Sequence, residues 1–562
     1  MANKIKTKGQ KQATGIKFQI IVPLLIVFAA FFVYNPATNN GILHGWDDTE
    51  YLLDKGVQDF NLKEIFTNYH LGMYQPLSVF TIAVDFHNTR LQGAKAHHIG
   101  NLLWHIINIL LVWVFVRKLT GKNTIAGVAA FLFALHPMNV EAVAWIAARS
   151  TLLFTACYIG GLLTYLKYTE NKKPLYFGLT ILLAALALFS KSLAISFPFV
   201  LFIIDYYKGR TWSIKLFLEK APFLILSIIF GIITIKAAQT FGHITELQHD
   251  YSLINRFFIL CYTFVFYLVK LVAPIDLSSI YSYPGLRGGS LPWLYYLSAL
   301  LPLGLIWLIY HYWKKQKKLI AGILFFSITI APVLPLFWSR VFIAADRYAY
   351  LSFIGLFLIA GILIDRLINK KYISNIIIRY GIAGILIVYG VFLMYSTNKQ
   401  CSYWKDGETL LTHAVTLSES APAKALAYFY RGNIRQGIAE KKHMEGQQSN
   451  NEGMVRNAFL YFGNAIRDYD STLAYNPQYM LAYSNRGIIY GTLANYDQKY
   501  QEMAWNDFDA AIQIDSGYAD NYYNKAWLLY MKGDLTTACE LWQKADRLGS
   551  VVAIQALEQY CR

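Results

Sequence analysis

Apolar segments fill the first 396 residues, and this feature constrains the fold more than any other. A helix needs about 20 apolar residues to cross a bilayer core of about 30 Å. Segments that approach this length lie at 17–35, 98–116, 124–142, 143–166, 174–191, 193–207, 219–238, 255–274, 291–312, 319–338, 347–368 and 377–396. The composition agrees with this pattern, since 56% of the residues are hydrophobic and only 15% are charged. We therefore expect an all-α, polytopic membrane domain over this part of the chain.

Charged residues between the segments indicate how the chain is threaded through the membrane. The formal charge of +17 does not point to a nucleic-acid partner, because the basic residues gather in short connections, as the positive-inside rule describes. The clusters expected in the cytoplasm are Arg117/Lys118/Lys122, Lys167/Lys172/Lys173, Lys208/Arg210/Lys215/Lys220, Lys314/Lys315/Lys317/Lys318 and Arg366/Lys370/Lys371. Twelve crossings cannot place all of them inside, so we expect 255–274 to be re-entrant or interfacial. About eleven spans and an outward C-terminus follow.

The first segment has the features of a retained signal anchor. The lysines that precede it are Lys4, Lys6, Lys8, Lys11 and Lys17. No small-residue cleavage site follows, so the segment is expected to stay in the membrane with its N-terminus in the cytoplasm.

The hydropathy falls near residue 398, which predicts a boundary between a membrane domain, 1–397, and a soluble domain, 398–562. Small and aromatic residues recur in the second domain at the spacing of tetratricopeptide repeats. The copies are marked by Tyr428, Gly432, Ala465, Tyr469 and Pro477, by Tyr483, Gly487, Ala504, Phe508 and Ala511, and by Tyr522, Ala526, Ala538, Trp542 and Ala545. We predict an α-solenoid of about three repeats, with a degenerate leading repeat around Trp404, Leu410 and Ala414 and a capping helix over 548–562. The stretches 440–451 and 495–497 are interpreted as insertions into this pattern, the first of them on the surface.

The five cysteines are Cys157, Cys261, Cys401, Cys539 and Cys561. They show neither metal-ligand nor disulfide spacing, and the first two lie in hydrophobic segments. The cysteines therefore predict no metal site and do not identify a redox compartment.

Paired carboxylates, Asp47 and Asp48, follow the first segment by about a dozen residues on the outward side. Asp is also favoured in turns and at helix N-caps, so the pair alone does not establish a site. Other polar residues occur at outward segment ends, where lipid would exclude them. They are His97, His98, Asn101, His105, Asn108, His136, Glu141, Arg149, Lys191 and Arg347. Such residues can line a cavity, bond one helix to another or extend to headgroups, and the sequence leaves these alternatives open.

Together these residues form motifs that resemble a known family. The motifs are Trp46-Asp47-Asp48, Tyr74-Gln75-Pro76-Leu77, His98-Ile99-Gly100-Asn101 through His105, Leu135-His136-Pro137 with Glu141 and Arg149, Ser190-Lys191 with Asp205-Tyr206, Tyr281-Ser282-Tyr283, and Asp346-Arg347-Tyr348-Ala349-Tyr350. In this order they look like the transmembrane and tetratricopeptide-repeat glycosyltransferases, multi-span enzymes of the GT-C class related to protein O-mannosyltransferases. Gln75 stands where that family commonly has Arg, and Thr151 where an acid is common, which leaves the substrate open.

The resemblance implies transfer of a sugar, mannose in the best-known relatives, from a polyprenyl-phosphate donor to an acceptor hydroxyl on the outer or lumenal face. A Ser or Thr hydroxyl needs a carboxylate to take its proton as it attacks, so Asp47 or Asp48 is the expected general base, with Asp48 slightly preferred. Cations stabilise the leaving phosphate, so Arg149, Lys191 and Arg347 are the candidates to bind it. The residues expected to shape the site or bind substrate are His98, Asn101, His105, His136, Glu141, Tyr283 and Tyr350.

The resemblance also sets expectations for cofactors and partners. No cofactor beyond the lipid-linked donor is expected, and a divalent ion on the paired acids is the less favoured alternative. The repeats are expected to hold the acceptor polypeptide. The alternatives are a GT-C transferase that acts on a lipid or glycan, and an inactive membrane-anchored scaffold. We expect a bacterial inner membrane with the catalytic loop and repeats in the periplasm, or a lumenal site in the endoplasmic reticulum of a eukaryote.

Overall fold

The computed structural model describes residues 19–44, 46–88, 93–240, 251–336, 342–368 and 375–561. Within these ranges the regular elements are helices, and the β pairings are isolated bridges at His70–Met73 and Arg287–Ser290. The all-α prediction is confirmed. The chain forms two compact units, one of Met1–Tyr281 with Leu286–Asp406 and one of Ser282–Gly285 with Gly407–Arg562.

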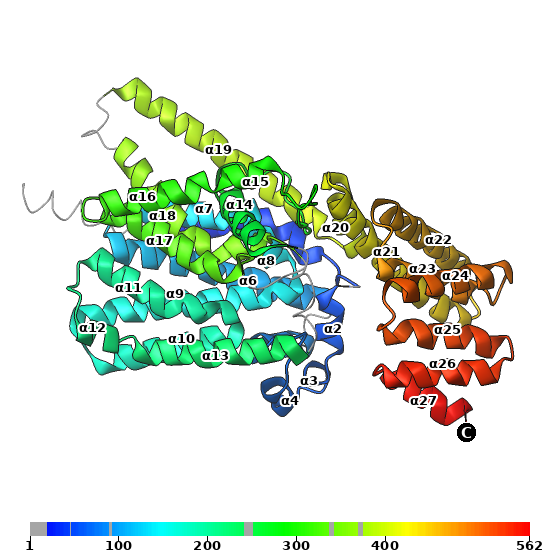
Figure 1. The fold of residues 1–562 in the computed structure, drawn as a ribbon. Coiled ribbons are helices and arrows are strands. Elements are labelled where there is room, and N and C mark those ends of the chain that lie inside the picture. The colour runs from blue at the N-terminus through cyan, green and yellow to red at the C-terminus, as the bar shows by residue number, and fades with distance from the viewer. Residues whose placement is uncertain are drawn as a thin grey trace, which may run out of the picture. The chain divides into compact units, whose positions relative to one another are not determined.

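The first unit, which we call the membrane unit, holds most of the helices (Figure 1). After a first helix over Gln19–Asn39, its α-helices are α2 (Asp47–Leu53), α3 (Lys55–Gln58), α4 (Leu62–Thr67), α5 (Pro76–Phe86), α6 (Ala94–Thr120), α7 (Asn123–Leu135), α8 (Val140–Ala144), α9 (Arg149–Asn171), α10 (Pro174–Ser190), α11 (Phe197–Lys208), α12 (Ile214–Leu218), α13 (Ala221–Thr240), α14 (Leu253–Val272), α15 (Trp293–Ser298), α16 (Leu300–Tyr312), α17 (Lys317–Ile330), α18 (Ala349–Ile368) and α19 (Ile376–Tyr403). Short 3₁₀ turns join several of them: η1 (Asn35–Asn39), η2 (Pro137–Asn139), η3 (Ile146–Ala148), η4 (Ser192–Ser196), η5 (Ala331–Val333) and η6 (Asp346–Tyr348).

Eight helices of the described ranges are long and apolar enough to cross a membrane, or nine if α7 and η2–α8 count as one span. That pair is bent by 57° at His136-Pro137, where proline cannot continue the hydrogen-bond ladder. Three other predicted spans are shorter helices, since α10 has 17 residues, α11 has 12 and α17 has 14. The count is therefore lower than the predicted eleven, but the chain is a multi-pass integral membrane protein.

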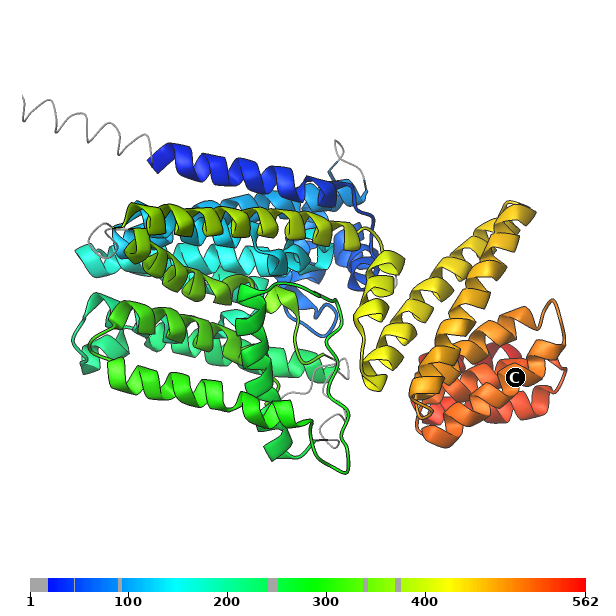
Figure 2. The ribbon, with the colours of Figure 1, turned by 90° about the horizontal axis from the view of Figure 1, so that it is seen from above.

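Helix α14 differs from its neighbours in direction. Figure 1 looks nearly along its axis, and Figure 2 shows it from the side, running across the direction that most other helices of the membrane unit share. Its outer face is apolar, with Ile254 68% exposed and Val272 also 68% exposed. A helix in this orientation fits the prediction that 255–274 lies along the membrane surface.

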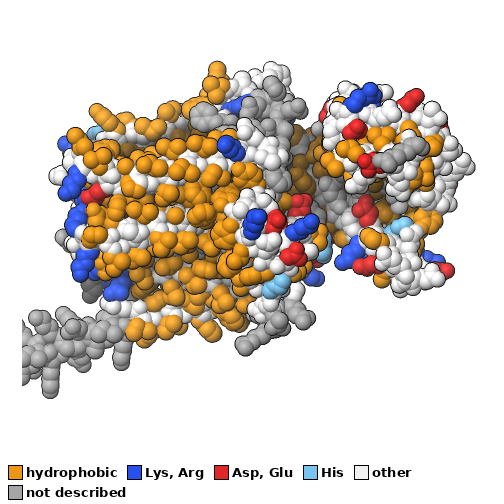
Figure 3. Space-filling view, turned by 90° about the horizontal axis from the view of Figure 1, so that it is seen from below, with side chains coloured by type: hydrophobic (Ala, Val, Ile, Leu, Met, Phe, Trp, Pro, Cys, Tyr) orange, Lys and Arg blue, Asp and Glu red, His pale blue; other side chains and the backbone are white. Residues whose placement is uncertain are grey.

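The basic clusters gather at one end of the membrane unit. Lys122 pairs with Asp365 at 2.5 Å, Lys118 with Glu170 at 3.8 Å, and Lys172 with Glu219 at 3.7 Å. Arg366 and Gln316 are hydrogen-bonded there as well, at 3.4 Å. Figure 3 shows Lys and Arg at that end of a surface that is otherwise mostly hydrophobic. The clusters predicted to share one side of the membrane therefore do so within the described residues, while the N-terminal lysines, Lys370 and Lys371 lie outside those residues.

The second unit consists of paired helices. They are α20 (Gly407–Leu417), α21 (Ala421–Gln448), α22 (Glu452–Tyr475), α23 (Met480–Leu493), α24 (Lys499–Ile514), α25 (Ala519–Met531), α26 (Leu535–Arg547) and α27 (Val551–Tyr560). A small residue faces an aromatic ring inside the pairs: a Cβ on Gly432 would lie 2.8 Å from the Tyr469 ring, and one on Gly487 would lie 2.9 Å from Phe508. This packing agrees with the small and aromatic register of the sequence, while the assignment to tetratricopeptide repeats stays a prediction.

The structure adds two details to the repeat prediction. The stretch 440–451 is mostly exposed and mostly helical, because α21 continues to Gln448 and only a short turn precedes α22. Trp404 does not begin a repeat, because it follows α19 in the membrane unit and stacks on Trp145 at 6.0 Å.

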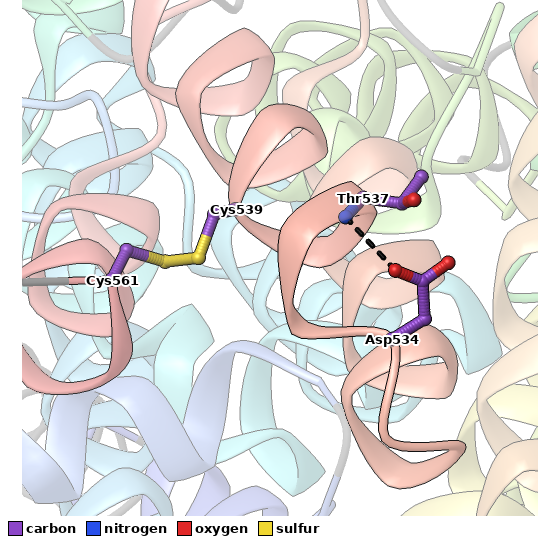
Figure 4. The surroundings of a disulfide bond; sticks show 4 residues. All are labelled: Asp534, Thr537, Cys539 and Cys561. Atoms are coloured by element: carbon purple, nitrogen blue, oxygen red, sulfur yellow. Dashed lines mark hydrogen bonds between the residues drawn. A yellow bond between two sulfur atoms is a disulfide. The ribbon is translucent and has the colours of Figure 1, made fainter.

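A disulfide joins Cys539 on α26 to Cys561 after α27, with the two Cα atoms 5.8 Å apart (Figure 4). The interpretation that the cysteines lack disulfide spacing is therefore wrong. The 22-residue separation gives no sequence signal, because pairing depends on how α27 folds back on α26. Asp534 caps α26 by accepting from the Thr537 amide at 3.1 Å, which fixes the start of the helix that carries Cys539. Disulfides persist in oxidising compartments, which bears on the side of the membrane where this unit resides.

Candidate active site

The two adjacent acids on α2 have different surroundings. The helix begins at Asp47, directly after Trp46, so both acids lie in its first turn. Asp48 is fully buried, whereas Asp47 is partly exposed. Successive residues of a helix point about 100° apart, so one acid can face the core while the other faces outward.

Asp48 connects the loop that precedes α2 to the break between α8 and α9. Its Oδ2 accepts from the Leu43 amide at 3.1 Å, and its Oδ1 accepts from the Ala147 amide at 2.9 Å. Burial raises the pKa of Asp48 to about 7, and the charge of Asp47 adds to the rise, while the two backbone amides oppose it. Both oxygens of Asp48 are thus engaged inside the protein, where they hold α2 in place.

Glu141 and Arg347 form an ion pair at the same end of the membrane unit. The Arg347 guanidinium donates to Glu141 Oε1, and the Arg347 amide donates to Glu141 Oε2 at 2.7 Å. Arg347 also lies over the Trp145 ring, 4.9 Å from its centroid, and its side chain is 19% exposed. Asp47 is among the charges that act on this guanidinium. The structure thus brings Asp47 and Arg347, two of the predicted functional residues, into one neighbourhood.

Arg149 has a different environment from Arg347. Its side chain is 1% exposed and donates to Asp85 at 2.5 Å, to the His97 carbonyl at 2.8 Å and to the Asn101 side chain. A Cβ on Gly100 would lie 2.7 Å from Arg149 Nη2, so only glycine leaves room for this pair. The geometry favours Arg149 as a residue that locks α5, α6 and α9 together, and it gives no support to phosphate binding.

Asp85 was not among the residues singled out from the sequence. Burial acts to raise its pKa, but the neighbouring His97 and the charge of Arg149 hold that pKa below its ordinary value. The sequence feature that could have identified Asp85 is its position as an acid near the end of α5, an otherwise apolar helix.

The polar stripe on α6 bonds helices to each other. Asn101 donates to the Trp145 carbonyl at 2.8 Å, and Asn108 donates to the Leu152 carbonyl at 2.9 Å. His105 is hydrogen-bonded to the Tyr350 hydroxyl at 2.7 Å and to the Ala134 carbonyl at 3.2 Å. These contacts favour the interhelical alternative over a ligand-facing stripe for Asn101, His105 and Tyr350.

The two remaining predicted histidines are also engaged with backbone. His98 is 3.3 Å from the Gly41 carbonyl, and buried His136 is 3.1 Å from the carbonyl of Leu271 at the end of α14. Both therefore connect loops and helix ends around the candidate site.

Lys191 and Tyr283 are the last two of the predicted site residues. Lys191 ends α10, is partly buried and donates to the Thr151 hydroxyl at 2.7 Å. Tyr283 lies in Ser282–Gly285, which belongs to the second unit. Among the described residues, no group of three His, Cys, Asp or Glu side chains could hold a metal ion.

Asp205, part of the resemblance motifs, serves a structural purpose at the basic end of the unit. Its carboxylate pairs with Lys220, which is fully buried, and with Arg210 at 2.9 Å, and it accepts from the Tyr165 hydroxyl at 2.8 Å. This network fastens α9, α11 and the start of α13 far along the helices from Asp47.

Comparisons with known proteins agree with the membrane unit's motifs. The family model described as dolichyl-phosphate-mannose-protein mannosyltransferase matches residues 87–237. Protein O-mannosyl-transferase F38B6.6 of Caenorhabditis elegans is 24% identical over 449 residues, which cover 76% of this chain and 61% of the relative. Protein O-mannosyl-transferase TMTC3 of Homo sapiens is 25% identical over 191 residues, 30% of this chain and 20% of that relative.

A solved structure was also matched, at low similarity. The apo oligosaccharyltransferase of Archaeoglobus fulgidus aligns with a TM-score of 0.41 and 14% identity, covering 74% of this chain and 60% of that chain. The chain spans about three fifths of the length of its Caenorhabditis elegans relative. The sequence matches show that this chain is similar to protein O-mannosyltransferases, as its motifs indicate.

Proposed function

We propose that the chain is a membrane glycosyltransferase that moves a hexose, mannose, from a polyprenyl-phosphate donor to Ser or Thr hydroxyls of exported or lumenal proteins. The relatives named as protein O-mannosyltransferases support the reaction class. The membrane-spanning helices support a lipid-linked donor, because its phosphate would lie at headgroup depth near the helix ends.

The observation that carries the proposal is that a partly exposed carboxylate, Asp47, lies near enough to act electrostatically on a partly exposed guanidinium, Arg347, at one end of the membrane unit. In the proposed step, the acceptor oxygen attacks the anomeric carbon and its proton passes to Asp47. The bond from that carbon to the phosphate oxygen breaks, and the leaving polyprenyl phosphate keeps the electron pair. Arg347 stabilises the charge on that phosphate.

Asp47 replaces Asp48 as the preferred base in this proposal. A general base must come within hydrogen-bond reach of the proton that it takes, and the two oxygens of Asp48 already accept backbone amides in a buried position. Lys191, which donates to the Thr151 hydroxyl at 2.7 Å and is partly buried, stays the second candidate for the donor phosphate. Glu141 orients Arg347.

The site is proposed to face the periplasm, or the lumen in a eukaryote. The disulfide in the second unit supports an oxidising compartment for that unit, and the basic clusters at the far end of the membrane unit fit the cytoplasm. The paired helices of the second unit are proposed to hold the acceptor polypeptide, and the reaction is proposed to need no divalent metal.

The test is transfer of mannose from polyprenyl-phosphate mannose to a Ser/Thr-rich peptide by the purified chain, with and without a chelator. D47N should lower the turnover by about 10²- to 10⁴-fold, the usual contribution of a general base. E50Q is the matched control, because Glu50 is an exposed acid on the same helix, and it should retain full turnover.

Equal turnover of D47N and wild type would exclude Asp47 as the base. Transfer to lipid or glycan but not to peptide would identify the other acceptor class. If the wild type transfers no sugar from any donor, the chain acts as a scaffold instead.

A further inference from the structure

Two partly exposed side chains, Trp46 and Arg347, contact Trp145, and Asp47 directly follows Trp46. Trp46 directly precedes Asp47, and its ring lies 6.3 Å from the Trp145 ring at an interplanar angle of 78°. Arg347 lies over Trp145 at 4.9 Å. Trp46, Asp47 and Arg347 are all partly exposed, so an indole, a carboxylate and a guanidinium remain accessible in one neighbourhood.

Trp145 serves as the support of this cluster rather than as a ligand surface. Its side chain is only 4% exposed, because the Arg347 guanidinium and the ring of Trp404 both pack on it. Trp404 is 2% exposed. Trp46 is therefore the most exposed of the three tryptophans.

A hexosyl phosphate presents three chemical features to a protein. The phosphate needs a cation, the anomeric carbon must lie near the base that serves the acceptor, and one face of the pyranose ring carries polarised C–H bonds. The negative face of an aromatic ring attracts such C–H groups, and the contact removes apolar area from water. Arg347 and Asp47 match the first two features, which leaves the indole for the third.

We propose that Trp46 is a sugar-contact residue whose ring packs against the hexose of the lipid-linked donor, beside Asp47 and Arg347. This assignment rests on the proposed function, but it concerns recognition of the sugar and not the proton transfer. It distinguishes the sugar-bearing lipid from the spent polyprenyl phosphate, because only the former reaches the ring.

The experiment compares wild type, W46F and W46A in detergent, with W293A as the matched control, because Trp293 is a 72% exposed tryptophan in another helix of the membrane unit. Two ligands are titrated separately: polyprenyl-phosphate mannose and bare polyprenyl phosphate. Binding is followed by thermal stabilisation of the protein, and transfer is followed in parallel. W46A should weaken binding of the mannose-bearing lipid by about tenfold and leave binding of the bare lipid unchanged. W46F should be intermediate, and W293A should match wild type.

Two results would overturn the assignment. W46A could bind the mannose-bearing lipid as tightly as wild type, or it could lose both lipids equally, which would make Trp46 a support for Arg347. Unaltered binding of bare polyprenyl phosphate also reports that the variant is folded. If wild type transfers no sugar, the proposed function fails, while the binding comparison still decides whether Trp46 reads the sugar.

Discussion

Asp48 makes the stability of the membrane unit depend on pH in a direction opposite to that of an ordinary ion-paired carboxylate. Burial raises its pKa from 3.8 to about 7 in the folded protein. A difference of about 3 pKa units corresponds to about 4 kcal/mol, because each unit is worth about 1.4 kcal/mol. This stabilisation is fully present below the unfolded pKa and is lost as the pH rises through about 7.

The perturbation is D48N, which keeps the shape of the side chain and removes its titration. Between pH 5.5 and 7 wild type should lose about 2 kcal/mol relative to D48N, at about 1.4 kcal/mol per pH unit. The melting temperature of wild type minus that of D48N should therefore fall by a few degrees over this interval and then level off.

The assay is thermal unfolding of both proteins in one detergent at four pH values from 5.5 to 8. D59N is the matched control, because Asp59 is an exposed acid of the same loop region. D59N measures the effect of replacing an exposed Asp by Asn in the same region. A constant difference between D48N and wild type would mean that Asp48 is already ionised in the folded protein at pH 5.5, and the argument from burial would fail.

Two further predictions concern packing and charge in the two units. E141Q should destabilise the membrane unit by about 3–5 kcal/mol, because it leaves the Arg347 guanidinium without the Glu141 carboxylate. Replacing both residues by leucine should destabilise the unit less. Equal melting temperatures for E141Q and wild type would contradict this prediction. G487A should destabilise the second unit by about 1–3 kcal/mol, because the new Cβ would lie 2.9 Å from the Phe508 ring. G463A should be neutral or stabilising, because nothing lies within 4 Å of a Cβ on Gly463. Thermal unfolding of the second unit measures both glycine variants, and equal losses would show that the close contact has no cost.

The membrane character and the grouping of basic clusters could be predicted because hydropathy and charge are local properties of a sequence. The partner of Arg347 could not, since Glu141 lies 206 positions away and meets it only when α8 and η6 pack together. The different burial of Asp47 and Asp48 depends on the rotation of α2 about its axis, which the identities of adjacent residues do not determine.

Other differences have equally physical causes. The helices at 193–207 and 319–338 are shorter than expected, because polar and proline residues end them with 3₁₀ turns that a sliding hydropathy average smooths over. The polar stripe on α6 marks bonds between helices as readily as it marks a cavity, so the sequence could not separate the two alternatives for Asn101 and His105.

The disulfide between Cys539 and Cys561 also determines where a pulling force acts on the second unit. A force on the last residues cannot unfold α27 one turn at a time, because the disulfide transmits the force directly to Cys539, in the first half of α26. Around that link, Trp527, Tyr530, Trp542 and Tyr560 form a tightly packed aromatic cluster. A force applied beyond Cys561 would therefore act on α26 before it could unfold α27.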